Sequence, residues 1–384
     1  MKCPHCLADL KYRDRRYSKK CPQCQSPFAL EPRDNALGLS DLRLRGFAER
    51  MSEQGKCWYT AAQLGYAIVR NKVKREPQFE SRMMMLIGIV VIMALVVICV
   101  RVWLFIESVS FFGFCLTFMV MIMVIMVVIL GRLAISQSLS PPQHPESSRL
   151  SLDRFLPVLE RFEEEYVVPW ERIHGVLPGR VTAQEAMALR RFQLPPSRVR
   201  AVLVSPVADV LDCLRVNGLP QRLGLALINP DQPAGADESI IALLRSRPRL
   251  PLLLVHDASV SGCLLPALLP ARWGLAPNHR IVDLGLRPRH VQQLRLPWKR
   301  EAPPRELLDL LERRAQMPNG LALTPEEREW LRSGYVTSAL FIPPARLVTI
   351  VTQAVERLAP ARIVDPEAQA QAQARAVGFM TWPS

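Results

Sequence analysis

Four cysteines near the N-terminus are the residues whose type and spacing most directly indicate chemistry. Cys3 and Cys6 form one Cys-x2-Cys pair. Cys21 and Cys24 form a second pair fourteen residues further on. Each pair can direct two sulfurs into one tight turn, and two such turns supply the four soft ligands that tetrahedral Zn²⁺ prefers. The spacing therefore predicts one zinc ion bound by Cys3, Cys6, Cys21 and Cys24.

Residues 1–36 resemble a zinc ribbon, with the form C-P-x-C … C-P-x-C followed by the apolar segment SPFAL. The resemblance implies that zinc staples a module too small for a core of its own. The alternative is that the ribbon binds a partner directly. His5, inside the first turn, is a candidate extra ligand. A redox role for the pairs is disfavoured because no βαβ pattern surrounds them.

Two apolar runs predict a transmembrane helical hairpin at 83–134, with spans at about 83–106 and 109–131. Each run, with its flanks, reaches the roughly 20 residues that cross a bilayer core. Basic residues in 70–82 place the N-terminus in the cytoplasm by the positive-inside rule, and a second span returns the C-terminus to the same side. We expect an integral protein of the plasma or inner membrane, with the lipid bilayer as a partner and both termini cytoplasmic.

Charge and cysteine usage are consistent with that expectation. The net charge is +14, and residues 1–82 carry 17 Lys and Arg against 9 Asp and Glu. Such an excess suits an anionic membrane surface. Nucleic acid remains open as a partner, but no long basic block supports it. Five further cysteines lack the spacing of a disulfide framework, which is typical of a reducing compartment. Ser40 and Thr60 are expected to cap two helices in the basic segment 37–82.

Beyond the predicted hairpin, short apolar runs alternate with helical segments. A Ser- and Pro-rich stretch at 135–150 is typical of a linker. Four buried strands are expected at 201–206, 224–230, 250–257 and 280–286, with helices between them. Alternation at this spacing predicts a parallel sheet covered by helices, an α/β fold. An amphipathic helix is expected from Leu152 to about Tyr166, and further helices follow residue 302.

Polar residues follow the predicted strands at the edge where α/β sheets bind ligands. They are Ser205, Asn229, His256, Asp257, Ser259 and Ser261. Ser, His and Asp invite a hydrolase interpretation, but adjacent strand residues point to opposite faces and no G-x-S-x-G elbow is present. An alternative role for Asp257 is to cap the helix that follows it. No P-loop or G-x-G-x-x-G motif indicates a nucleotide site.

Residues 200–297 resemble the Toprim domain of type IIB topoisomerase A subunits. The matching segments are LPLLLVHDASVSG and RIVDLGLRPRHVQQLRLP, in which Asp257, Gly262, Gly285, Leu286, Pro288 and Val291 fit the family pattern. The resemblance implies a metal-dependent strand-cleaving site with Asp257 as the candidate catalytic residue. Ser205 and Ser259 stand where the family has carboxylates, which leaves Asp257 alone to hold Mg²⁺. A generic Rossmann-like sheet, with the likeness arising from ordinary α/β patterning, is the alternative.

The sequence therefore predicts a multidomain membrane protein: a zinc ribbon, a transmembrane hairpin and a cytosolic Rossmann- or Toprim-like α/β domain with C-terminal helices. We expect a membrane-anchored binding or scaffolding component with structural zinc and a protein partner; no small-molecule substrate is identified. The alternative is a membrane-tethered, Toprim-like metal-dependent nuclease or phosphodiesterase using Asp257, and catalysis is the less favoured of the two. The expected divisions are 1–36, 37–82, 83–134, 135–150, 151–300 (α/β domain), 301–364 (helical extension) and 365–384 (tail).

Overall fold

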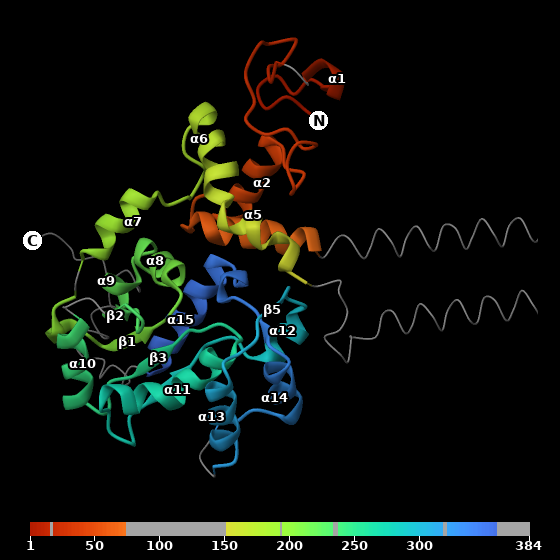
Figure 1. The fold of residues 1–384 in the computed structure, drawn as a ribbon. Helices are drawn as coiled ribbons and strands as arrows, with labels where there is room; N and C mark the ends of the chain where they lie inside the picture. The colour runs from red at the N-terminus through yellow and green to blue at the C-terminus, as the bar shows by residue number, and fades with distance from the viewer. Residues whose placement is uncertain (16–17, 74–150, 193, 233–236, 318–320, 359–384) are drawn as a thin grey trace, which may run out of the picture.

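The computed structural model describes residues 1–15, 18–73, 151–192, 194–232, 237–317 and 321–358 (Figure 1). Within them, four short aliphatic runs pair in parallel in the order β2-β1-β3-β4. Strands β1 and β3, in the centre, are buried throughout, as expected where helices cover both faces. The predicted parallel α/β sheet is confirmed. The strands are β1 Ala201–Val204, β2 Leu225–Ile228, β3 Leu252–Leu254 and β4 Ile281–Asp283.

Helices lie on both faces of the sheet because consecutive strand residues point in opposite directions. Leu203 and Leu253 share one core with α8 Ala208–Val216, α9 Leu219–Leu223 and α15 Pro344–Leu358. Val202 and Leu252 point the other way, into a core built with α10 Asp237–Ser246 and α11 Val260–Trp273. Figure 1 shows these two layers on opposite sides of the strands.

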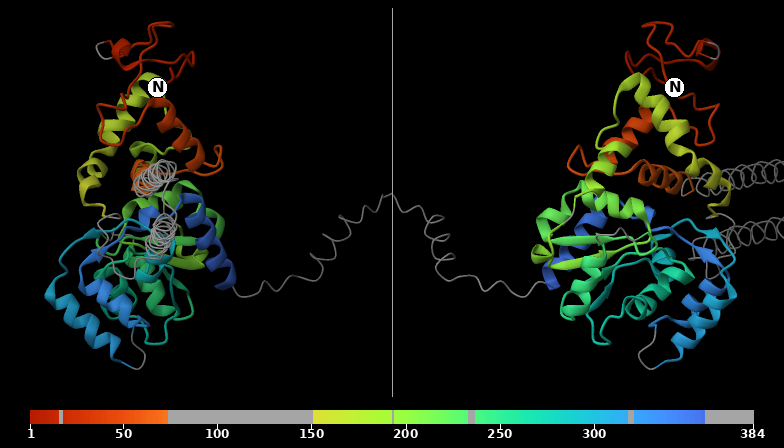
Figure 2. Two further views of the ribbon diagram at one scale, coloured as in Figure 1. Left: turned by 90° about the vertical axis from the view of Figure 1, so that its right-hand side faces the viewer. Right: turned by 60° about the vertical axis from the view of Figure 1, so that its left-hand side comes forward.

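A third core joins segments that are far apart in the sequence. Leu44 of α2 Asp41–Met51 and Leu64 of the helix at 61–73 pack with Phe162 and Tyr166. The same core continues to Leu311 and Leu331, on helices that follow the sheet. The N-terminal helices are therefore part of the main body, and the cysteine-rich segment lies at one end of it (Figure 2).

The remaining elements frame these cores. Strands β5 Lys299–Arg300 and β6 Tyr335–Val336 pair antiparallel. The others are α1 Tyr12–Arg15, η2 Asp153–Phe155, α5 Leu156–Glu160, η3 Glu163–Val167, α6 Val168–His174, α7 Ala183–Arg190, η4 Pro196–Arg198, α12 Pro288–Leu294, α13 Arg305–Ala315, α14 Pro325–Arg332 and η5 Ala339–Phe341.

The helix expected from Leu152 to Tyr166 is interrupted. The chain forms the 3-10 turn η2, the short helix α5, the π-helical turn η3 and then α6. Pro157 and Pro169 lie at the starts of α5 and α6. Proline has no N–H for the preceding turn and its ring crowds the carbonyl four residues earlier, so the expected α-helix cannot run unbroken through Pro157. Pro169 lies beyond the expected helix, in the first turn of α6.

The expectation of an integral membrane protein requires correction. Among the described residues, no helix is both long enough and apolar enough to cross a membrane. The long helix α15 has 15 residues and exposes one face, whereas a span needs roughly 20 apolar residues. The predicted hairpin at 83–134 and the linker at 135–150 lie outside the described residues. The fold class is therefore a parallel α/β sheet with helices and an N-terminal cysteine cluster, and the membrane localisation is withdrawn.

Asp41 fastens the cysteine-rich segment to the body. Its buried carboxylate accepts hydrogen bonds from the backbone N–H groups of Ala29 (2.9 Å) and Leu30 (2.8 Å). The Nε2 atom of His174, at the end of α6, lies 2.7 Å from the same carboxylate. Ser40, expected to cap α2, makes no side-chain capping bond. The contacts of Asp41 thus join three separate segments at one point.

We expect Asp41→Ala to lower the free energy of unfolding by about 2–4 kcal/mol, because buried N–H groups would lose their acceptor. Urea unfolding followed by circular dichroism measures the change. The matched control is Asp34→Ala, which removes an exposed carboxylate nearby and should change stability by less than about 0.5 kcal/mol. Equal stabilities of the two variants would contradict the anchoring role of Asp41.

Candidate functional site

The two cysteine pairs lie in two turns of the same conformation. In each turn the residue after the second cysteine, Leu7 or Gln25, has a left-handed backbone with φ of 60°. Its N–H donates to the carbonyl of the first cysteine of its own turn, at 3.2 Å for Leu7 and 2.9 Å for Gln25. Antiparallel bridges between Lys2 and Asp9 and between Lys20 and Pro27 close the two loops. The local spacing of the cysteines therefore produces two matching metal-binding turns.

The four sulfur atoms converge. All ligand atoms of the cluster lie within 4.8 Å of one another. The Sγ atoms of Cys3 and Cys24 are 3.6 Å apart, as are those of Cys6 and Cys21. A tetrahedron with Zn–S bonds of about 2.3 Å has edges of about 3.8 Å. The cluster thus has the donor set and the spacing for one tetrahedral metal ion.

Hydrogen bonds prepare the cluster for metal. The side chain and backbone of Ser26 lower the pKa of the Cys24 thiol to about 6. For Cys6, the Ala8 backbone lowers the pKa, but burial and the neighbouring thiols outweigh it and raise the pKa to about 12. Because thiolates are the metal ligands, metal binding releases the protons that the thiols still hold.

His5, considered as an extra ligand, does not belong to the cluster. The cluster consists of the four cysteines. The ring of His5 lies 5.4 Å from the ring of His174, whose Nε2 atom contacts Asp41. His5 therefore links the first metal-binding turn to the body of the protein.

The second candidate site is the carboxyl edge of the sheet. Most of the polar residues expected there serve local turns. Ser205 Oγ accepts from the N–H of Val207, and Asn229 Oδ1 accepts from that of Asp231. Ser259 Oγ caps α11 by accepting from Gly262 at 3.0 Å and also contacts Ser261.

Asp257 does not cap the helix that follows it. Its carboxylate accepts the backbone N–H of Ala339 at 2.6 Å and contacts the hydroxyl of Ser338 at 3.4 Å. Burial raises the pKa of Asp257, and the hydrogen bond from Ala339 opposes that shift. In a sheet of order 2-1-3-4, ligands usually bind between the ends of β1 and β3. Here η5 lies at that place, between β3 and the start of α8.

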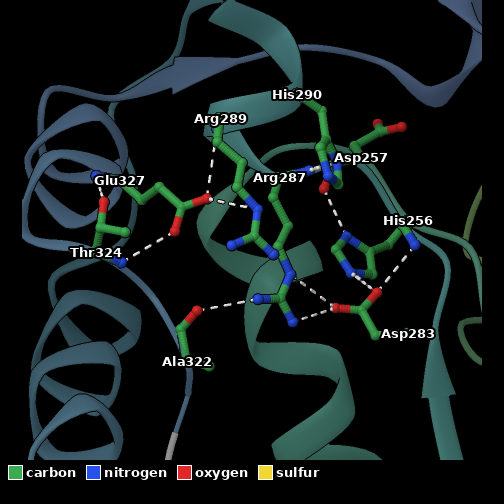
Figure 3. A network of polar contacts seen from close by, with 10 residues as sticks. His256, Asp257, Asp283, Arg287, Arg289, His290, Ala322, Thr324 and Glu327 are labelled. Atoms are coloured by element: carbon green, nitrogen blue, oxygen red, sulfur yellow. Dashed lines mark hydrogen bonds and ion pairs between the residues drawn. The ribbon is translucent and has the colours of Figure 1, made fainter. Parts of the chain in front are cut away.

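His256 pairs with Asp283 rather than with Asp257 (Figure 3). The imidazole is fully buried, with Nε2 3.0 Å from Asp283 Oδ1 and Nδ1 2.8 Å from the carbonyl of Asp257. Both nitrogens face acceptors, so both bonds form together only when the ring is doubly protonated. Neither nitrogen is free to activate a serine, which removes the basis of the hydrolase interpretation.

Asp283 and Arg287 complete this network. Arg287 donates two hydrogen bonds to Asp283 Oδ2, at 2.8 and 3.2 Å, and a third to the carbonyl of Ala322. Burial raises the pKa of Asp283, but the bonds from His256 and Arg287 outweigh it and hold the pKa well below its ordinary value. Sequence reasoning missed this pair. The available signal was that Asp283 ends β4, the strand adjacent to β3.

Two glycines that fit the Toprim pattern have a packing explanation. A Cβ atom at Gly285 would lie 2.3 Å from atoms of the His256 ring. A Cβ at Gly262 would lie 2.3 Å from the carbonyl oxygen of Asp257 and 2.9 Å from His256 Nδ1. Both positions therefore require glycine, because the His256 ring fills the space at Gly285 and the Asp257 carbonyl and His256 fill it at Gly262.

We expect Gly285→Ala to lower the free energy of unfolding by about 2 kcal/mol, because the added methyl group overlaps the His256 ring. The matched control is Gly46→Ala in α2, where the nearest atom lies 3.6 Å away. That variant should be neutral or more stable by up to about 1 kcal/mol. Denaturant unfolding compares them, and a Gly285→Ala protein as stable as the Gly46→Ala protein would refute the packing explanation.

We expect the contribution of Asp283 to stability to be present above the ordinary carboxyl pKa and lost as pH falls through its lower folded-state pKa. Wild type should exceed Asp283→Asn by about 2 kcal/mol at neutral pH, and the difference should shrink below about pH 4. Unfolding titrations of both proteins across pH measure it. Loss of the metal in acid would destabilise wild type and Asp283→Asn equally, so the difference between their free energies of unfolding reports on Asp283 alone. A gap that does not change with pH would contradict the charged pair.

Comparison with known proteins adds no further assignment. The chain matches no protein-family model, and neither a curated protein nor a solved structure matches it significantly. The Toprim resemblance therefore gains no support. The geometry of this chain establishes a four-cysteine cluster fit for a metal ion and a parallel α/β sheet whose polar edge is engaged by the chain itself.

Proposed function

We propose that this protein is a binding and scaffolding component, in which structural zinc holds an N-terminal ribbon on an α/β body that does not perform catalysis. The observation that carries the proposal is the hydrogen bond from Ala339 to Asp257 at the carboxyl edge of the sheet. It engages the one carboxylate that the enzyme interpretation needs.

The choice of zinc rests on the donor set. Four thiolates in a tetrahedron suit Zn²⁺ or iron, and all-protein coordination without an open position is typical of structural sites. The ribbon has a small core of its own, comprising Cys3, Leu10, Cys21 and Phe28. Metal–sulfur bonds would therefore supply much of its folding free energy.

The ribbon end offers a surface for a protein partner. Leu7 and Val176 are each 61% exposed. They lie two residues from His5 and His174, whose rings are in contact. The contact between the two histidine rings brings the two segments together, which supports the proposal that these side chains belong to one surface for a protein partner.

We expect one zinc ion per purified full-length chain and its loss in Cys21→Ser, because three thiolates hold zinc less tightly than four. Elemental analysis by mass spectrometry measures the ratio. Cys263→Ala, which removes a buried cysteine outside the cluster, should keep one zinc. A chain without metal, a chain loaded with iron, or zinc retained by Cys21→Ser would contradict the assignment.

We expect the full-length protein to leave DNA and RNA intact in Mg²⁺ or Mn²⁺, because the carboxylate of Asp257, which would have to hold the metal ion, already accepts the backbone N–H of Ala339. The matched control is Asp257→Asn, which keeps an oxygen acceptor for Ala339. Gel analysis of both preparations is decisive: metal-dependent cleavage by wild type that Asp257→Asn abolishes would overturn the non-catalytic role and establish the nuclease alternative.

A further inference from the structure

A groove of about 710 Å³ lies away from both the cysteine cluster and the carboxyl edge. It runs between the loop at 52–58, the end of α8 and the first turns of α15. The residues that matter for its chemistry are Glu53, Lys56, Trp58, Asn217, Arg222 and Arg346. We call it the Trp58 groove.

Trp58 has a fixed backbone and an open side chain. Asn217 accepts its N–H through Oδ1 at 3.0 Å and donates to its carbonyl through Nδ2 at 2.9 Å. The next residue, Tyr59, pairs with the backbone of Gly179 and Val181. The Trp58 side chain nevertheless remains 44% exposed. A tryptophan that served only to fill the core would be buried. The fold instead leaves much of Trp58 exposed to solvent.

The loop before Trp58 has an unusual backbone. Glu53, Gln54 and Gly55 have φ values of 46°, 61° and 90° in succession. Positive φ costs free energy at non-glycine residues and persists only where the surroundings enforce it. Backbone hydrogen bonds hold the loop in this conformation: the N–H of Gln54 donates to the carbonyl of Glu49 at 3.1 Å, and the N–H of Cys57 donates to that of Ser52 at 2.9 Å. The protein maintains a strained loop that places Trp58 and Lys56 at the groove.

The groove is positively charged. Lys56, Arg222 and Arg346 are exposed, and Glu53 is the one acid among its lining residues. No ion pair within the described part of the chain neutralises these three cations. Burial lowers the pKa of Arg70, and the positive charge of Arg346 lowers it further, so Arg346 adds positive charge to its surroundings. An aromatic side chain beside cations without ion-pair partners suits a ligand that has a planar ring at one end and an anionic group at the other.

The positive charge continues along the edge where the parallel strands begin. Arg200, Arg222, Arg249 and Arg280 each lie within three residues of the start of a different strand, and all are exposed without an ion pair in the described residues. By contrast, Arg245 at the end of α10 pairs with an acid. A ligand with several phosphates in a row would match this edge better than a single anion would.

We propose that the Trp58 groove binds single-stranded nucleic acid, with a base stacked on Trp58, its phosphate on Arg222 and Arg346, and the strand continuing toward Arg200 and Arg249. Stacking on an aromatic side chain combined with a basic track is how sequence-tolerant binders hold single strands. A free nucleotide carries the same base and phosphate, so the test must separate the two sources. The inference goes beyond the proposed function and does not depend on the metal.

The test uses the full-length, metal-loaded protein and a fluorescent oligothymidylate of about 12 nucleotides, within the usual site size of such binders. Fluorescence anisotropy should show binding that weakens with salt, because phosphate contacts release counterions. Trp58→Ala should weaken binding about tenfold or more, and Trp58→Phe should restore most of it. Arg222→Gln combined with Arg346→Gln should weaken it further and reduce the salt dependence. Phe192→Ala, which removes a similarly exposed aromatic outside the groove, should leave affinity unchanged.

A second arm distinguishes the source of the ligand. Arg249→Gln should weaken the binding of the oligonucleotide. It should not change the affinity for adenosine monophosphate, because Arg249 lies outside the groove. Tighter binding of the mononucleotide than of the strand would overturn the single-strand assignment, as would equal affinity for duplex DNA. Absence of binding, or binding that Trp58→Ala and the paired arginine changes leave intact, would overturn the site itself. None of these outcomes alters the zinc content or the cleavage test, so the proposed function stands or falls separately.

Discussion

The hydrogen bond between the Asp257 carboxylate and the backbone N–H of Ala339 is the constraint on which the arrangement of the body depends. It holds η5 across the end of β3, from where the chain enters α15. That helix then covers one face of the sheet through Leu347 and Val351. One contact therefore both completes the core and occupies the place where α/β sheets usually receive a ligand. A carboxylate that looks catalytic in the sequence acts as a fastening point in the fold.

Two other carboxylates, the buried Asp41 and the half-buried Asp283, act in the same way. Asp41 joins the cysteine-rich segment to α2 and α6, and Asp283 joins β4 to the His256 ring and to Arg287. Each is satisfied by donors from within the chain, as buried acids must be. These three carboxylates therefore stabilise the fold. In our proposals, recognition relies on exposed features, namely the ribbon end and the Trp58 groove.

Local patterns were predictable from the sequence, and long-range pairings were not. The Cys-x2-Cys spacing determines a turn within a few residues, and runs such as AVLV and LLL indicate buried strands, so both appear where expected. The partner of Asp257 lies 82 residues away, and Asp283 lies 27 residues from His256. No spacing rule connects such residues. The segment from Leu152 to Tyr166 is a third case, in which an amphipathic pattern predicts one helix and the chain forms η2, α5 and η3 in succession.

We propose that the metal is a structural ion, bound by four thiolates with no open coordination position, in a protein that acts by binding. X-ray absorption at the zinc edge of the full-length protein tests it most directly, because it counts the ligands around the ion. We expect four sulfur atoms at about 2.3 Å from the ion and no nitrogen or oxygen ligand. A shell containing nitrogen, or an oxygen from bound water, would reveal an open coordination position and contradict a purely structural centre.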